Sequence, residues 1–137
     1  MSSVHFYLFE TRDERQAFSA CRLCRKILRQ HPTQKIWFFI QDLAQQQNID
    51  ALLWSFDETS FIGHGIDEIS SPVCLSAQLP PSSDWIVFNF NPDAITQFSQ
   101  FHRIIEIIEN NEMAKQFGRE KFKQYRQLGI KPTTYKL

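Results

Sequence analysis

The chain has 137 residues, which is the size of one domain and long enough to bury a real hydrophobic core. Its apolar fraction of 42% and charged fraction of 22% are ordinary for a soluble globular protein, and no stretch approaches the roughly 20 apolar residues of a membrane span. The net charge of zero hides an asymmetry, because residues 115–137 hold seven of the fifteen Lys and Arg residues but only one acid.

Apolar runs alternate with helix-like segments along the chain. Strands are predicted at residues 4–9, 36–40, 73–75, 85–90 and 103–108, the last because its isoleucine doublets favour a buried strand over a helix. Helices are predicted at residues 13–30, from 42 to about 53 or 54, from 92 to about 101, and from 111 to 128, while residues 56–71 show no assignable pattern. This alternation predicts a single α/β domain with a mostly parallel sheet of about five strands and a C-terminal helix.

The residue patterns of common catalytic sites do not occur at the expected places. The turn after the first predicted strand, residues 10–14, has no glycine that would let a phosphate approach the backbone. Cys21 and Cys24 fall inside a predicted helix, so we interpret them as small core residues rather than redox or metal ligands. His64, near several acids, is interpreted as a loop histidine with ordinary hydrogen bonds. We therefore expect no catalytic residue, no metal and no cofactor.

The cysteine count and the N-terminus also bear on location. Three cysteines form an odd set, and no basic segment followed by an apolar one precedes the first predicted strand. Both features favour reduced thiols and a cytoplasmic protein.

The last predicted helix has one unusual face. At 100° per residue, a ring and several cations fall together on it. These residues are Lys115, Arg119, Phe122 and Arg126, with Lys123 beside them. The opposite face, predicted to be the core stripe, carries Met113, Phe117, Tyr125 and Leu128.

Three interpretations of this basic face remain open from the residues alone. Phe122 could be tucked partly at the edge of the sheet while the cations are simply solvated. Alternatively, an apolar notch ringed by Lys and Arg could receive a peptide that bears carboxylates and an apolar end, since guanidinium groups bind carboxylates well. Single-stranded nucleic acid is the third candidate, although the rest of the domain is acidic and would repel a long polyanion.

A second aromatic cluster, made of Trp54, Phe56 and Phe61, lies at the start of the unassigned region. It could pack in the core beneath a loop, or it could be an exposed anchor for a partner, because aromatic residues are common hot spots of interfaces.

Three stretches of the chain resemble the chi subunit family of bacterial DNA polymerase III holoenzyme. Residues 4–8 resemble its opening strand, and residues 51–64 resemble its Leu-Trp and Ser-Phe-x-Pro-His segment. Its C-terminal signature is similar to residues 119–129, Arg-Glu-Lys-Phe-Lys-Gln-Tyr-Arg-Gln-Leu-Gly. The resemblance implies a three-layer α/β/α sandwich with a parallel five-stranded sheet. It also implies a non-catalytic accessory protein of the clamp-loader complex in DNA replication.

The resemblance further implies two protein partners. One is the psi subunit, with which family members form a heterodimer, and the psi-facing residues would be Trp54 and Phe61. The other is the acidic, Phe-terminated tail of single-stranded-DNA-binding protein. By motif, its site would comprise Lys115, Arg119, Phe122, Lys123 and, as apolar lining, Ile108.

Two positions depart from the family pattern. Phe122 stands where the family commonly has Tyr, so the ring is kept and the hydroxyl is lost. Gly63 replaces the Pro before the His, which loosens the backbone there. We expect no membrane or direct nucleic-acid partner; the alternative is a small single-stranded nucleic-acid-binding module that uses the basic C-terminal helix.

Overall fold

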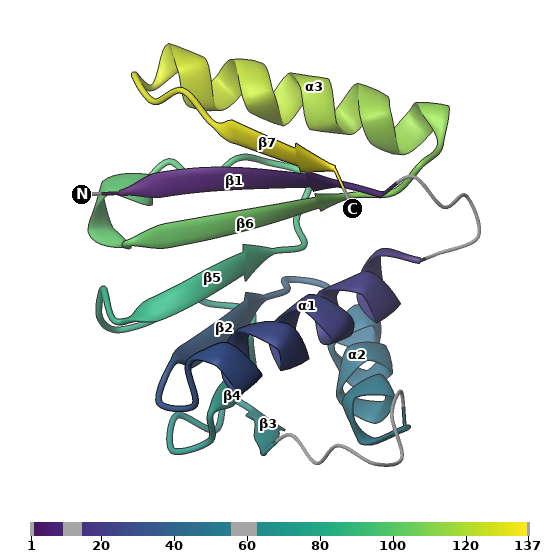
Figure 1. The fold of residues 1–137 in the computed structure, drawn as a ribbon, viewed down its shortest axis with the longest axis vertical. Coiled ribbons are helices and arrows are strands. Elements are labelled where there is room, and N and C mark those ends of the chain that lie inside the picture. Colours follow the sequence, from purple (N-terminus) through teal and green to yellow (C-terminus); the bar gives the residue numbers. More distant parts are fainter. Residues whose placement is uncertain (1, 10–14, 56–62, 137) are drawn as a thin grey trace.

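The computed structural model describes residues 2–9, 15–55 and 63–136, and these form one parallel sheet with helices on both faces (Figure 1). The strands are β1 (Ser3–Leu8), β2 (Lys35–Phe39), β3 (His64–Ile66), β4 (Val73–Ser76), β5 (Trp85–Asn89), β6 (Arg103–Ile108) and β7 (Thr133–Lys136). The helices are α1 (Gln16–Gln30), α2 (Leu43–Ser55) and α3 (Glu112–Gln127). None of these helices is long and apolar enough to cross a lipid bilayer.

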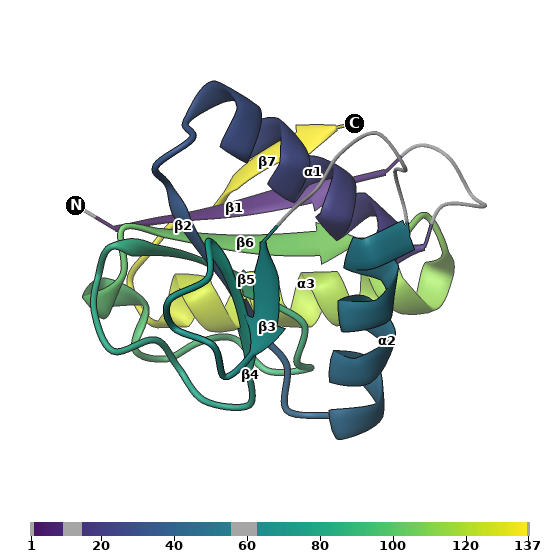
Figure 2. The ribbon, with the colours of Figure 1, turned by 90° about the horizontal axis from the view of Figure 1, so that it is seen from below.

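The strand order is β3-β4-β2-β5-β6-β1-β7, and every neighbouring pair is parallel. Figure 2 shows α1 on one face of the sheet and α3 on the other. The core is divided accordingly, because side chains of a strand alternate between the faces. One cluster packs α1 and α2 against one face, and the second packs α3 against the other. This is the predicted sandwich of three layers.

Each of the five predicted strands is present, and the sheet is parallel as expected. The described residues, however, contain seven strands rather than about five. Strand β3 lies in the stretch without an assignable pattern, and β7 follows the last helix. Both are short strands at the two edges of the sheet, and both are held by pairing with one neighbour, β4 or β1.

Two predicted helices, at residues 42–54 and 111–128, have ends close to those observed, and side chains or a glycine explain these ends. The Asp42 carboxylate accepts a hydrogen bond from the backbone N–H of Gln45 at 3.0 Å, which caps α2. The Asn111 side chain accepts one from the N–H of Ala114 at 2.8 Å, which caps α3. Gly129, with a φ of 96°, ends α3. The predicted start of α1 at residue 13 lies outside the described residues.

The prediction of a helix at residues 92–101 is wrong, because only a short 3₁₀ helix, Phe98–Gln100, forms there. The backbone N–H of Ala94 donates instead to the Gln124 side chain at 2.8 Å. The N–H of Ile95 donates to the Tyr125 hydroxyl at 3.1 Å. Side chains of α3 thus accept hydrogen bonds from backbone N–H groups that a helix would have used for its own hydrogen bonds.

The predicted core stripe of α3 is also wrong, except at Tyr125. Met113, Phe117 and Leu128 are exposed by 72%, 54% and 41%, whereas Tyr125 is fully buried. The helix instead turns Gly118 and Lys121 toward the sheet. The buried Lys121 finds a carboxylate on β6, so this helix is oriented by an ion pair as well as by apolar residues.

Candidate functional site

A cavity of about 230 Å³ lies where α3 packs against β6, β1 and β7. Its lining residues are Phe6, Leu8, Ile108, Lys115, Gly118, Arg119, Phe122 and Thr134. The cavity therefore brings together four of the five residues predicted for peptide binding. The fifth, Lys123, is exposed on α3 and does not line it.

The alternation of side chains along the strands builds the floor of this cavity. Phe6 and Leu8 of β1 and Ile108 of β6 all face α3. The Phe6 ring meets the Phe122 ring edge to face, with centroids 5.5 Å apart and an interplanar angle of 62°. Phe122 is half-buried, so it is tucked against the sheet and still lines the cavity. The interpretation that Phe122 packs at the edge of the sheet and the interpretation that it lines an apolar notch are thus compatible with one geometry.

Gly118 lets α3 approach β6 closely enough to form the cavity. A Cβ atom at this position would lie 2.8 Å from Cδ1 of Ile108, which is closer than real side chains allow. Sequence reasoning overlooked this residue. A glycine in the interior of a long helix was the available signal, because it costs about 1 kcal/mol relative to alanine.

The dimensions and charges of the cavity limit what it can hold. At roughly 30 Å³ per water molecule, it has room for about seven or eight waters. It is smaller than the roughly 300–1,000 Å³ typical of small-molecule sites. Lys115 is half-buried and Arg119 is exposed at its edge. This arrangement can receive one apolar side chain while a neighbouring carboxylate meets the two cations.

A buried polar cluster fixes α3 beside the cavity. Glu106 of β6, which is fully buried, receives three side-chain donors. Lys121 Nζ lies 2.7 Å from its Oε1, and the Tyr125 hydroxyl and Asn89 Nδ2 each donate to its Oε2 at 2.7 Å. The cluster thereby joins β5, β6 and α3. Sequence reasoning assigned Lys121 to neither face of the helix; a single Glu within an isoleucine-rich strand was the missed signal.

The electrostatics of this cluster are those of a satisfied structural group. Burial raises the pKa of the Glu106 carboxyl group, and the adjacent charge of Lys121 opposes that rise. Burial, followed by the charge of Glu106, raises the pKa of the Tyr125 hydroxyl. The donors are already engaged with the carboxylate, so the cluster holds the helix rather than a ligand.

The second predicted site lies on α2. Trp54 is 58% exposed, which favours the anchor interpretation of this residue over core packing. Its ring centroid lies 4.6 Å from that of His64 on β3, and His64 Nε2 lies 3.1 Å from the carbonyl oxygen of Asp50. Phe61, the other predicted psi-facing residue, lies outside the described residues, as does Phe56. His64 thus sits at the start of a strand with ordinary hydrogen-bond partners.

The N-terminus of α1, where α/β proteins often bind phosphates, is filled by the chain itself. The backbone N–H of Gln16 donates to Glu109 Oε1 at 2.8 Å, and the Gln16 side chain donates to the carbonyl oxygen of Ile107 at 3.0 Å. Glu109 follows β6 and thus places a carboxylate where a nucleotide would place a phosphate. This geometry agrees with the missing phosphate loop in the sequence.

Cys21 and Cys24 lie in the core beneath α1, which confirms their interpretation as core residues. Burial raises the pKa of the Cys21 thiol to about 12, so it carries little thiolate near neutral pH. Across the described ranges, no three His, Cys, Asp or Glu side chains come together as a metal site.

Comparisons with known proteins relate the sequence of this chain to a family. The family model described as "DNA polymerase III chi subunit, HolC" matches residues 1–133. The DNA polymerase III subunit chi of Pseudomonas aeruginosa is 30% identical over 133 residues, covering 94% of this chain and 92% of that relative.

Proposed function

This chain belongs to the DNA polymerase III chi subunit family, and from that membership we propose that it is a non-catalytic adaptor in the cytoplasm. The adaptor links the clamp-loader complex, through the psi subunit, to the acidic C-terminal tail of single-stranded-DNA-binding protein during DNA replication. The observation that carries this proposal is the cavity beside α3, which combines an apolar floor with Lys115 and Arg119.

The cavity supports a peptide partner more than a small molecule. Its volume of about 230 Å³ suits one side chain, here the terminal Phe of the tail. The rings of Phe6 and Phe122 offer that side chain aromatic contacts. Arg119 would hold the terminal carboxylate or a nearby acid, and Lys115 and the exposed Lys123 would attract the acidic run before it.

The two proposed sites would lie on opposite faces of the sheet, which supports simultaneous binding of both partners. The cavity lies between α3 and one face of the sheet, whereas α2, which carries Trp54, packs in the core cluster of the other face. A bridge between two proteins requires that neither partner blocks the other, and this separation provides it.

Titration of a labelled peptide that is acidic and ends in Phe tests the tail site. Arg119→Glu is expected to weaken binding by at least about tenfold, because a charge-assisted pair becomes a repulsion. Affinity should also fall steeply with salt. Arg126→Glu is the matched control, since Arg126 is exposed on the same helix, about 10 Å further along its axis, and does not line the cavity. Equal losses in both variants would refute the assignment of the site.

Size-exclusion chromatography with the psi subunit tests the second site. Trp54→Ala is expected to reduce heterodimer formation and to leave tail-peptide binding unchanged, because Trp54 is 58% exposed and does not line the cavity beside α3. Loss of both activities in this variant would contradict two independent sites.

Direct binding of single-stranded nucleic acid by the basic face of α3 is the competing function. It predicts an oligonucleotide affinity tighter than micromolar at physiological salt, with that affinity lost in Arg119→Glu. Such a result would replace the adaptor proposal.

A further inference from the structure

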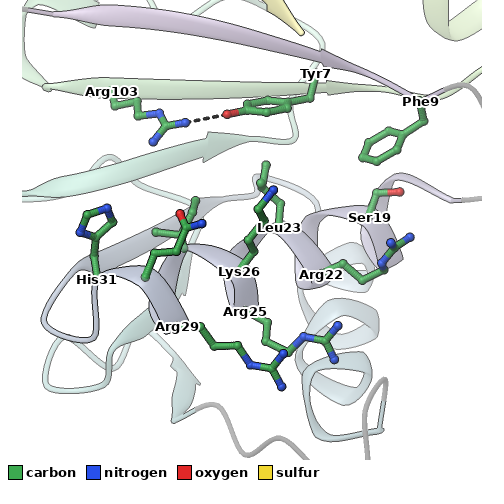
Figure 3. A pocket seen from close by; sticks show the side chains of 12 residues that line it. Tyr7, Phe9, Ser19, Arg22, Leu23, Arg25, Lys26, Arg29, His31 and Arg103 are labelled. Carbon is green, nitrogen blue, oxygen red and sulfur yellow. Dashed lines mark hydrogen bonds between the residues drawn. The ribbon is translucent and has the colours of Figure 1, made fainter. Parts of the chain in front are cut away.

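A second and larger hollow, of about 720 Å³, lies on the other face of the sheet, between α1 and strands β1 and β6 (Figure 3). Its lining residues are Tyr7, Phe9, Ser19, Arg22, Leu23, Arg25, Lys26, Ile27, Arg29, Gln30, His31 and Arg103. We call this hollow the α1 groove. Neither the peptide site beside α3 nor Trp54 contributes to it, so the proposed adaptor function leaves it unexplained.

The α1 groove is strongly basic. Five Lys and Arg residues and one His line it, and none of its described lining residues is a carboxylate. Figure 3 shows Lys26 extending from α1 toward the strands, whereas Arg25 and Arg29 extend to the far side of the helix. Arg103 reaches in from β6. Cations from a helix and from a strand thus face one another across the hollow, which suits an anionic ligand lying between them.

An aromatic stack borders the groove on its strand side. Arg103 Nη2 donates to the Tyr7 hydroxyl at 2.6 Å, and Arg103 Nε donates to His5 Nδ1 at 3.1 Å. Tyr135 of β7 stacks on Tyr7, with ring centroids 5.1 Å apart and an interplanar angle of 21°. Tyr135 remains 41% exposed, so ring surface is available beside the cations. A stacked ring next to cations can hold a planar base as well as an anion.

One buried hydroxyl in the groove has no hydrogen-bond partner among the described residues. Ser19 is 1% exposed and lines the hollow, and its Oγ has no hydrogen-bond partner in the parts of the chain that the structure describes. Phe9 and Arg22 line the same hollow (Figure 3). A buried hydroxyl without a partner is costly, so its position in a basic hollow points to an acceptor supplied by a ligand.

We propose that the α1 groove binds a short stretch of single-stranded nucleic acid, with phosphates between Lys26 and Arg103 and a base stacked on Tyr135. The groove is too large for the single side chain that suits the cavity beside α3. An acidic peptide would satisfy the cations but would leave the aromatic stack unused, whereas a nucleotide chain uses both. This site differs in place from the nucleic-acid alternative on α3.

The number of cations sets the salt dependence that this binding should show. If Lys26 and Arg103 each neutralise one phosphate, the slope of log affinity against log salt concentration is about −1.4 for a single strand. A tenfold rise in salt should then weaken binding by about 25-fold. Binding is therefore best measured at low salt.

The test measures fluorescence anisotropy of a labelled oligothymidine of about 12 nucleotides with the full chain at low salt. Lys26→Glu is expected to weaken binding by at least about tenfold. Lys131→Glu, which changes the net charge equally at another exposed lysine, should weaken it by less than about twofold. Equal losses in the two variants would show diffuse attraction and overturn the proposal, as would the absence of binding.

The aromatic contact has its own pair of variants. Tyr135→Ala is expected to lower affinity by about tenfold, and Tyr135→Phe, which keeps the ring, should restore it. An abasic oligomer should bind the unaltered protein as weakly as the thymidine oligomer binds Tyr135→Ala. Polyglutamate that binds this groove as tightly as the oligomer would overturn the nucleic-acid proposal in favour of an acidic peptide. Arg119→Glu should leave oligomer binding unchanged, so failure here is distinguishable from failure of the tail site.

Discussion

Replacing Lys121 by Met removes the only positive charge bound to Glu106 within the described residues, while keeping a long side chain in place. Lys121 is 6% exposed and Glu106 is fully buried, so the carboxylate cannot exchange its lost partner for bulk water. Its Oε2 keeps the donors from Tyr125 and Asn89, each at 2.7 Å. The variant thus isolates the contribution of one charge in a cluster that otherwise stays intact.

The expected loss is large on the scale of protein stability. Removing one partner of a buried ion pair costs about 3–5 kcal/mol. Because Glu106 keeps two hydrogen bonds and can take up a proton, we expect the lower end, about 3 kcal/mol. With a urea m value of about 2 kcal/mol/M, the unfolding midpoint should fall by about 1.5 M. A total stability of roughly 5–15 kcal/mol leaves the variant folded.

The loss should depend on pH in a definite direction. Burial raises the pKa of Glu106, and the charge of Lys121 is the largest influence that lowers it, so the variant has the higher folded-state pKa. The unfolded carboxyl group titrates near about 4.3. Because the pKa of Glu106 is higher in the folded protein than in the unfolded chain, protonated Glu106 favours folding. This contribution to the free energy of unfolding is complete at pH values below the unfolded pKa and is lost as the pH rises. The deficit relative to the unaltered protein should therefore widen from pH 5 to pH 8.

Urea unfolding at both pH values measures these effects. The double variant Glu106→Gln/Lys121→Met is the control, because it buries no charge and should recover to within about 1 kcal/mol of the unaltered protein. A deficit for Lys121→Met below about 1 kcal/mol, or one that is equal at both pH values, would refute the reasoning.

Three further predictions concern the caps, the cavity and a histidine. Asn111→Ala loses the 2.8 Å hydrogen bond that caps α3, and it should lower the free energy of unfolding by about 1 kcal/mol and the thermal midpoint by about 4 °C. Asn111→Ser keeps a capping side chain and should change little. An equal loss in both variants would contradict the capping role. Gly118→Ala should displace the Ile108 side chain and weaken tail-peptide binding about fivefold in a titration. The free energy of unfolding measured with urea should change by less than about 1 kcal/mol, because the gain in helix propensity offsets the close contact. Unchanged peptide binding would contradict the close packing of α3 on β6. Burial, followed by the charge of Arg103, lowers the pKa of His5 below its usual value of 6.5, so the neutral form stabilises the fold and stability should fall as pH drops below about 6.5. His5→Asn should flatten that dependence in thermal unfolding between pH 5 and pH 7, and an unchanged slope would assign it to another group.

The strands of the sheet interior could be predicted because their apolar runs are long enough to specify burial on both faces. Strand β7 could not be predicted in this way. All four residues of Thr133–Lys136 are exposed, and the strand exists because β1 offers it a hydrogen-bonding edge. The helix predicted after Pro92 fails for a related reason, since its amides bind Gln124 and Tyr125 about 30 residues later in the chain.

The sequence was sufficient to predict most residues that line the candidate peptide site, but not the orientation of the helix that carries them. Helical spacing and family resemblance together grouped Lys115, Arg119 and Phe122, and the cavity contains all three. The orientation of the helix depends on Lys121, whose partner Glu106 lies on another element. A lysine that is buried because of a carboxylate far away in the sequence leaves no local sequence pattern. The predicted exposed and buried faces of α3 were therefore partly the reverse of those observed.

The place of β1 in the sheet also constrains how the protein is made. Its two neighbours are β6 and β7, and Ser3 pairs with Arg103 and His5 with Thr133. At a synthesis rate of roughly 5–20 residues per second, the 99 residues between Ser3 and Arg103 take about 5–20 s to appear. During that interval the apolar β1 has left the ribosome without either strand that will flank it. The first of the described strands to be synthesised is thus among the last to be paired, and chaperone binding during translation should concentrate on β1.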